Sequence, residues 1–164
     1  MASGAEWTIV RSAFFNQNFS ESFMADSIPA GVVALPVNGA REPFVDVDDI
    51  AEIVAQSVTE DRHVGQIYEV TGPELLAFGE AVAQIAHATD RSVTFVPMSV
   101  EEYTDAARAQ GVPDEIIEVV AELFPHITDG RNEYLSDGVE QALGRAPRRF
   151  ADYARDAAAA GAWG

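Results

Sequence analysis

The stretch Trp7-Thr8-Ile9-Val10-Arg11 combines β-branched and aromatic residues in a short run, which predicts a buried strand. It runs directly into Ser12-Ala13-Phe14-Phe15-Asn16-Gln17-Asn18-Phe19. The phenylalanines of this region recur near helical spacing, at Phe14, Phe15, Phe19 and Phe23. We therefore expect residues 14–25 to form a helix, or a loop that leads into one.

The rest of the chain alternates between strand-like and helix-like apolar patterns. Short apolar runs bounded by Gly, Pro or Asn predict strands at 32–37, 66–70 and 93–97. Helical spacing of apolar residues predicts helices at about 46–59, 76–88, 100–110, 113–124, 137–143 and 150–160. The strand, helix and strand between 66 and 97 are typical of a βαβ unit, which implies parallel pairing.

Composition excludes several classes of site. The chain has 164 residues, a net charge of −17 and no cysteine, and its ten basic residues are all arginine. The lack of lysine excludes a Walker lysine, a Schiff-base lysine and a Tyr-x-x-x-Lys reductase pair, and the lack of cysteine excludes thiolate catalysis. The strong negative charge argues against nucleic acid as a partner. No apolar run is long enough for a membrane span and no signal peptide is evident, so we expect a cytoplasmic protein without membrane contact.

Acidic and histidine residues offer weak candidates for metal sites. Asp46 and Asp49 suit a capping box at a helix start better than a calcium loop, because Ala51 stands where such a loop needs glycine. The histidines are scattered and none has the i, i+4 spacing of a zinc helix, so we expect no metal. His126 lies in a stretch read as a loop that could line a pocket. Arg148 and Arg149 are expected to form a solvated or salt-bridged face, with a bound anion as the alternative.

Four stretches, taken in order, carry a resemblance to a known family. They are the strand at 7–11 with Phe15 and Asn18; Phe44-Val45-Asp46-Val47-Asp48-Asp49-Ile50-Ala51; Tyr68-Glu69-Val70-Thr71-Gly72-Pro73-Glu74 with the later Val93-Thr94-Phe95; and Leu143-Gly144-Arg145-Ala146-Pro147-Arg148-Arg149-Phe150. In this order they resemble the C-terminal half of NmrA-like proteins, which are atypical short-chain dehydrogenases/reductases that bind NAD(P).

The resemblance implies an α/β fold. It would be the C-terminal portion of a Rossmann-type parallel sheet with a small, mainly helical substrate lobe. We expect a single truncated domain over 1–164, with late Rossmann strands and helices in about 1–72. The substrate lobe, with a βαβ element, would occupy about 73–164.

The resemblance also implies where a site lies. Ser12, Ala13 and Phe14 would face the nicotinamide, although family members usually have proline where Ser12 stands. The substrate pocket would include Phe14, Phe15, Asn18 and His126, with Asn18 either a loop anchor or a polar group of the site. The sequence assigns no catalytic residue.

The glycine-rich loop that holds a dinucleotide has no counterpart in the sequence. The glycines never fall as G-x-G-x-x-G, so the pyrophosphate lacks a cradle of backbone N–H groups, and we expect no tight binding of NAD(P) by this chain alone. One hypothesis is therefore the substrate-side half of an NAD(P)H-dependent oxidoreductase that acts on a small organic substrate. The alternative is a non-catalytic NmrA-like regulatory or partner-binding module. Both leave a sheet edge exposed, which predicts a homodimer or a partner chain that covers it.

Overall fold

The computed structural model describes residues 4–22, 24–37 and 39–164, so Phe23 lies outside the described residues. Its strands are β1 (Ile9–Ser12), β2 (Val32–Leu35), β3 (Arg41–Glu42), β4 (Ile67–Val70), β5 (Leu76–Ala77) and β6 (Thr94–Pro97). Its α-helices are α1 (Asn18–Glu21), α2 (Val47–Ser57), α3 (Phe78–Thr89), α4 (Val100–Ala109), α5 (Asp114–Ile127), α6 (Gly138–Leu143) and α7 (Phe150–Ala159). Two 3-10 turns, η1 (Ala25–Ser27) and η2 (Asp61–His63), complete the order.

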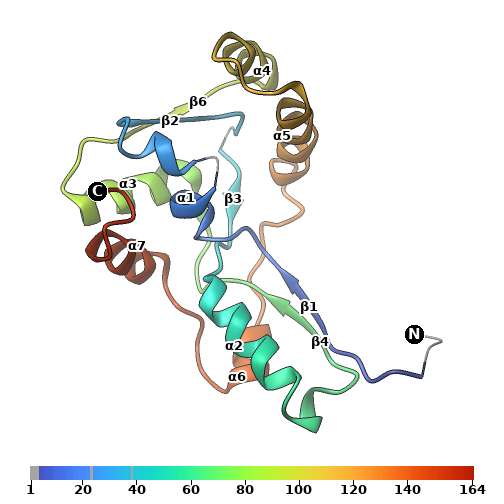
Figure 1. The fold of residues 1–164 in the computed structure, drawn as a ribbon. Coiled ribbons are helices and arrows are strands. Elements are labelled where there is room, and N and C mark those ends of the chain that lie inside the picture. Colours follow the sequence, from blue (N-terminus) through green and yellow to red (C-terminus); the bar gives the residue numbers. More distant parts are fainter. Residues whose placement is uncertain (1–3, 23, 38) are drawn as a thin grey trace.

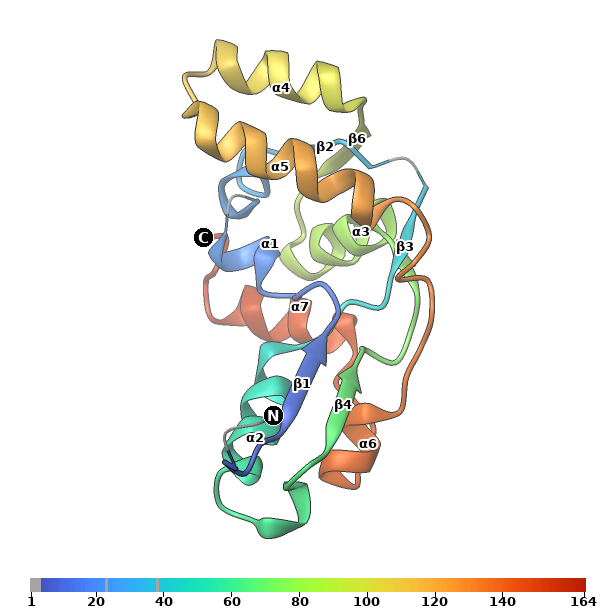
Figure 2. The same ribbon diagram turned by 90° about the vertical axis from the view of Figure 1, so that its right-hand side faces the viewer.

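The predicted opening strand pairs with β4. β1 and β4 are parallel, with Ile9 opposite Ile67 and Arg11 opposite Glu69. Helices α2 and α6 lie on one face of this pair, and the two views show no element on its other face (Figures 1 and 2). A small core fills the covered side and consists of Val45, Ile53, Tyr68, Val70, Val139 and Ala142.

The larger lobe is built around an aromatic core. Strands β2 and β6 are parallel, β3 and β5 are antiparallel, and helices α4 and α5 lie side by side at the far end of the lobe (Figure 2). Phe44 lies at the centre, with ring centroids 5.0 Å from Phe78, 5.4 Å from Phe150 and 5.6 Å from Phe19. These rings meet mostly edge to face, the arrangement that their quadrupoles favour.

Two expectations about local structure are wrong, and a third is met by its second alternative. Strands β4 and β6 do not form a βαβ unit, because β5 intervenes to pair with β3, and β6 pairs with β2. For residues 14–25 the second alternative holds, because a parallel bridge to Val45 keeps Phe15 extended and this loop leads into α1 at Asn18. His126 lies in the last turn of α5 and not in a loop, because Phe124 and Ile127 continue the buried face of that helix past Pro125.

Helix α2 begins where the sequence predicts, but without the full capping box. The side chain of Asp46 accepts a hydrogen bond from the backbone N–H of Asp48 at 2.9 Å, which caps the helix. Asp49 does not reach back to the cap. Its carboxylate instead binds Arg145 and Arg148, which precede α7. The arginine cluster therefore forms salt bridges, which is the first of the two arrangements expected from the sequence.

No helix in the described part of the chain is long and apolar enough to cross a bilayer.

Candidate functional site

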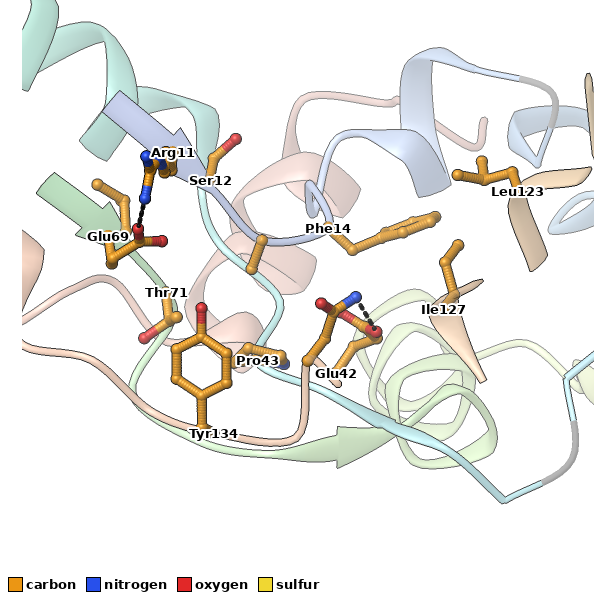
Figure 3. A pocket seen from close by; sticks show the side chains of 13 residues that line it. Arg11, Ser12, Phe14, Glu42, Pro43, Glu69, Thr71, Leu123, Ile127 and Tyr134 are labelled. Carbon is orange, nitrogen blue, oxygen red and sulfur yellow. Dashed lines mark hydrogen bonds and ion pairs between the residues drawn. The ribbon is translucent and has the colours of Figure 1, made fainter. Parts of the chain in front are cut away.

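A cavity of about 250 Å³ lies at the carboxyl ends of β1 and β4 (Figure 3). In sheets of parallel strands this edge is where ligands bind. The cavity collects residues from β1, β3, β4, α5 and the segment after α5. Its lining residues are Arg11, Ser12, Ala13, Phe14, Glu42, Pro43, Glu69, Val70, Thr71, Leu123, Ile127, Asn132 and Tyr134.

A close approach of two backbones brings β3 to this edge. The N–H of Gly72 donates to the carbonyl oxygen of Pro43 at 3.0 Å. A Cβ atom at position 72 would lie 1.9 Å from the carbonyl oxygen of Phe44, so no residue other than glycine fits without movement. The Thr71-Gly72 turn after β4 therefore places Glu42 and Pro43 beside the end of β1.

The segment after α5 closes the cavity, and the end of β4 anchors it. The hydroxyl of Thr71 accepts a hydrogen bond from the N–H of Ser136 at 3.0 Å, and the hydroxyl of Ser136 donates to the carbonyl oxygen of Glu69. These bonds hold the chain from Asn132 to Ser136 against β4. Asn132 and Tyr134 consequently become part of the cavity wall.

Glu42 is the most unusual group of the cavity. It is 1% exposed, and its Oε1 accepts a hydrogen bond from Nδ2 of Asn132 at 3.2 Å (dashed in Figure 3). Its Oε2 has no hydrogen-bond partner among the described residues. Burial raises the pKa of Glu42 to about 7, with the hydrogen bond from Asn132 opposing the rise and the charge of Glu133 adding to it.

The nearby arginines are all engaged by other acids. Arg11 pairs with Glu69 at 2.8 Å, and Arg41 pairs with Glu80 at 3.1 Å. Within the part of the chain that the structure describes, no arginine pairs with Glu42. A carboxyl group with this surrounding can bind a proton or a cationic group near neutral pH.

The residues expected beside a nicotinamide lie together in the structure, whereas the other residues expected in the substrate pocket lie elsewhere. Ser12, Ala13 and Phe14 all line the cavity. Phe15 and Asn18 lie outside its lining, Phe15 at the bridge to Val45 and Asn18 at the first turn of α1. His126 is exposed on α5 and is also outside the lining.

Sequence reasoning missed Glu42 and Asn132. Glu42 stands between Arg41 and Pro43, in a segment without helical or strand periodicity, so nothing in the sequence marks it as buried. Asn132 and Glu42 are 90 residues apart in the chain. A weak signal was available in the sequence, since Gly72 in Thr71-Gly72-Pro73 suits a close backbone approach.

The described residues fit one end of a dinucleotide. Ser12 to Phe14 form a wall at the carboxyl edge of parallel strands, where a nicotinamide ring could lie against a largely apolar surface. They do not fit the pyrophosphate, because the chain contains no G-x-G-x-x-G loop at a helix start. Among the described residues, no group of three or more His, Asp or Glu is placed to hold a metal ion.

Sequence comparison finds relatives among oxidoreductases, although no family model matches the chain. It is 31% identical over 159 residues to the NAD(P)H azoreductase of Xenophilus azovorans. The alignment covers 96% of this chain and 55% of that protein. It is 26% identical over 156 residues to the agroclavine dehydrogenase of Claviceps fusiformis, with 93% of this chain and 54% of that protein covered. The chain thus spans about half the length of the curated relatives that it matches.

Comparison with solved structures identifies the fold. The triphenylmethane reductase of Citrobacter sp., solved with NADP(H), superposes with a TM-score of 0.80 at 20% identity, over 95% of this chain and 54% of that chain. NmrA, a negative transcriptional regulator solved with NAD, superposes with a TM-score of 0.58 at 19% identity, over 96% and 54%. The chain therefore has the Rossmann-like α/β fold of NAD(P)-binding reductases, and its sequence relatives include NAD(P)H oxidoreductases.

Proposed function

We propose that this chain is the substrate-side part of an NAD(P)H-dependent oxidoreductase of the NmrA-like type that acts on a small organic substrate. The observation that carries the proposal is the position of Ser12, Ala13 and Phe14. They line a cavity at the carboxyl edge of parallel strands, where Rossmann-like enzymes bind their ligands. The phosphate-binding loop would come from other polypeptide, either covalently joined or a separate chain.

In this proposal the cofactor supplies a hydride when it is bound, and the residues of this chain position the acceptor. Phe14 is held edge to face against Phe44 and Phe78, at 5.7 and 5.4 Å between ring centroids, so its ring is a fixed wall. Leu123 and Ile127 of α5 add apolar surface that keeps water from the bound substrate. Polar groups of the cavity, Glu42 and Tyr134, would orient the substrate.

Titration of the chain with NADPH tests this proposal. We expect backbone amide resonances of Ser12, Ala13 and Phe14 to shift, with a dissociation constant on the order of 1 mM or weaker because the pyrophosphate is not held. Ala13→Leu, which narrows the cavity, should abolish these shifts. His126→Ala is the matched control outside the cavity and should leave them unchanged. Absence of shifts at these three residues at saturating NADPH would contradict the proposal.

The alternative is a non-catalytic regulatory module with the same fold. It is favoured by the lack of a glycine-rich loop, because a chain that grips the cofactor weakly is poorly suited to turnover. Loss of NADPH absorbance with an added quinone or azo dye, in the presence of a polypeptide that supplies the loop, separates the two. Binding without oxidation would favour the regulatory module.

We also propose that other polypeptide covers the open face and free edge of the β1–β4 pair. Parallel sheets are normally covered on both faces, whereas Ile67 of β4 is 43% exposed here. An unpaired strand edge invites pairing with another strand. Light scattering should give a mass above that of the monomer, and Ile67→Lys should reduce it. A monomer that binds no apolar dye would refute this proposal.

A further inference from the structure

The carboxyl group of Glu42 faces the cavity without a counter-charge. We propose that this cavity binds a small aromatic amine, with the protonated nitrogen of the ligand on the carboxylate of Glu42. The inference rests on the proposed function, because it names a substrate class for the same cavity. The site would then prefer cationic ligands with a flat apolar body to neutral ones of the same shape, and would disfavour anionic ones.

The first support is an acid that lacks a partner. Glu42 is 1% exposed, one of its oxygens accepts only the neutral amide of Asn132, and the other has no hydrogen-bond partner among the described residues. A buried carboxylate is costly unless it is paired. A ligand ammonium group would supply the missing positive charge and a donor for the free oxygen.

The second support is the charge around Glu42 on each element that packs against it. From β1 and β4 come Arg11 and Glu69, which neutralise each other at 2.8 Å. From the segment after α5 come Glu133, which adds negative charge, and the uncharged Asn132 and Tyr134. On β3, the strand that carries Glu42, Arg41 forms an ion pair with Glu80 of α3. The net charge near the cavity is therefore negative, which disfavours anions.

The third support is the shape and lining of the cavity. Its volume of about 250 Å³ is slightly below the range of about 300–1,000 Å³ typical of small-molecule sites, which favours a ligand with one aromatic ring. Six apolar residues share the lining with the acid, and they come from β4, α5 and the segments that follow β1 and β3. They are Ala13, Phe14, Pro43, Val70, Leu123 and Ile127.

Calorimetry with three matched probes tests the inference in the absence of cofactor. The probes are benzylamine, which is cationic at pH 7, neutral benzyl alcohol and anionic benzoate. We expect benzylamine to bind about tenfold or more tightly than benzyl alcohol, since a hydrogen bond between charged groups stabilises more than a neutral one, and benzoate not to bind. Equal affinity for amine and alcohol, or no binding of the amine, would overturn the inference.

Proton release gives a second readout that packing alone cannot produce. Burial raises the pKa of Glu42 to about 7, so part of the population is protonated near neutral pH. An ammonium ligand favours the carboxylate, so binding should release a fraction of a proton per ligand, measured in buffers of different ionisation enthalpy. In the wild-type chain the affinity should also rise from pH 6 to pH 8. A pH-independent affinity without proton release would contradict the role of Glu42.

Two variants localise the effect. Glu42→Gln keeps an acceptor for Asn132 and should weaken benzylamine binding about tenfold or more and abolish proton release. Glu133→Gln removes the same charge from an exposed neighbour outside the cavity and should change the affinity by about twofold or less. Because no cofactor is present, failure of amine binding leaves the NADPH titration of Ser12 to Phe14 unaffected. The two proposals can therefore fail separately.

Discussion

Two carboxyl groups are buried to the same degree in different surroundings. Asp49, in the first turn of α2, is 0% exposed, and Glu42, on β3, is 1% exposed. The carboxylate of Asp49 forms ion pairs with Nη2 of Arg145 at 2.8 Å and with the guanidinium of Arg148. It also accepts a hydrogen bond from the backbone N–H of Arg148 at 2.8 Å. Glu42 receives one amide hydrogen bond from Asn132.

Partners, and not burial alone, therefore decide what a buried acid does. Asp49 joins the start of α2 to the segment before α7, so its charge holds two parts of the fold together. Glu42 has no such partner and lines a cavity, so burial raises its pKa to about 7 and leaves it free to respond to a ligand. The first group is structural, and the second suits binding.

Removal of Asp49 should have the largest effect on stability. Asp49→Ala deletes the acceptor for Arg145 and for both groups of Arg148, and the loss of these charged hydrogen bonds should cost about 3 kcal/mol, since the two arginines are 34% and 39% exposed and regain water. Urea unfolding measures the loss. Asp48→Ala, on the exposed side of the same helical turn, is the control and should cost less than about 1 kcal/mol. A similar loss in both variants would show that the helix terminus, and not the ion pair, is responsible.

Glu42 should make stability depend on pH in the opposite sense to a paired acid. Its folded-state pKa of about 7 lies above its usual value of 4.5, so the folded state binds the proton more tightly than the unfolded chain. The free energy of unfolding should then fall by about 2 to 3 kcal/mol between pH 4.5 and pH 8, with little change above that.

The variant Glu42→Gln provides the matching measurement. It has no ionisable group at this position, so its unfolding free energy should not decrease between pH 4.5 and pH 8 in this way. The difference between variant and wild type then gives the contribution of Glu42 to the pH dependence. Urea unfolding at pH 4.5, 6 and 8 gives the curves. Parallel curves for the two proteins would mean that Glu42 is ionised normally in the folded state.

Local parts of the fold could be predicted from the sequence. The strand near Trp7–Arg11 and the helix that begins after Asp46 depend on neighbouring residues, and both form. Strand pairing depends on distant contacts, and the expected pairing of 66–70 with 93–97 is wrong. The sequence left 14–25 open between a helix and a loop that leads into one, and a distant contact decides for the loop, because Val45 holds Phe15 in a bridge.

The candidate site divides in the same way. Ser12, Ala13 and Phe14 follow the opening strand directly, so a resemblance in sequence could place them at the cavity. Glu42 could not be placed, because its burial needs Gly72 against Phe44 and its hydrogen bond needs Asn132, far along the chain. Such groups have no local pattern that marks them.

Removal of the partner of Glu42 should have a smaller effect. Asn132→Ala deletes the hydrogen bond that opposes the rise in the pKa of Glu42, so this pKa should move further up. The chain should lose about 1 kcal/mol at pH 8, where the carboxylate needs the donor most. Urea unfolding across pH measures both changes. Tyr134→Phe, in the same cavity wall, is the control and should not move the pH dependence.

The outer acid of the arginine cluster should matter least. Glu52 pairs with Arg145, and the two side chains are 40% and 34% exposed. Because water and salt screen such a pair, Glu52→Gln should cost about 0.5 kcal/mol or less, and the cost should vanish at high salt. Urea unfolding at low and high salt measures it. A loss as large as that of Asp49→Ala would mean that Arg145 depends on both acids, and the buried carboxylate alone would then no longer explain how α2 is held.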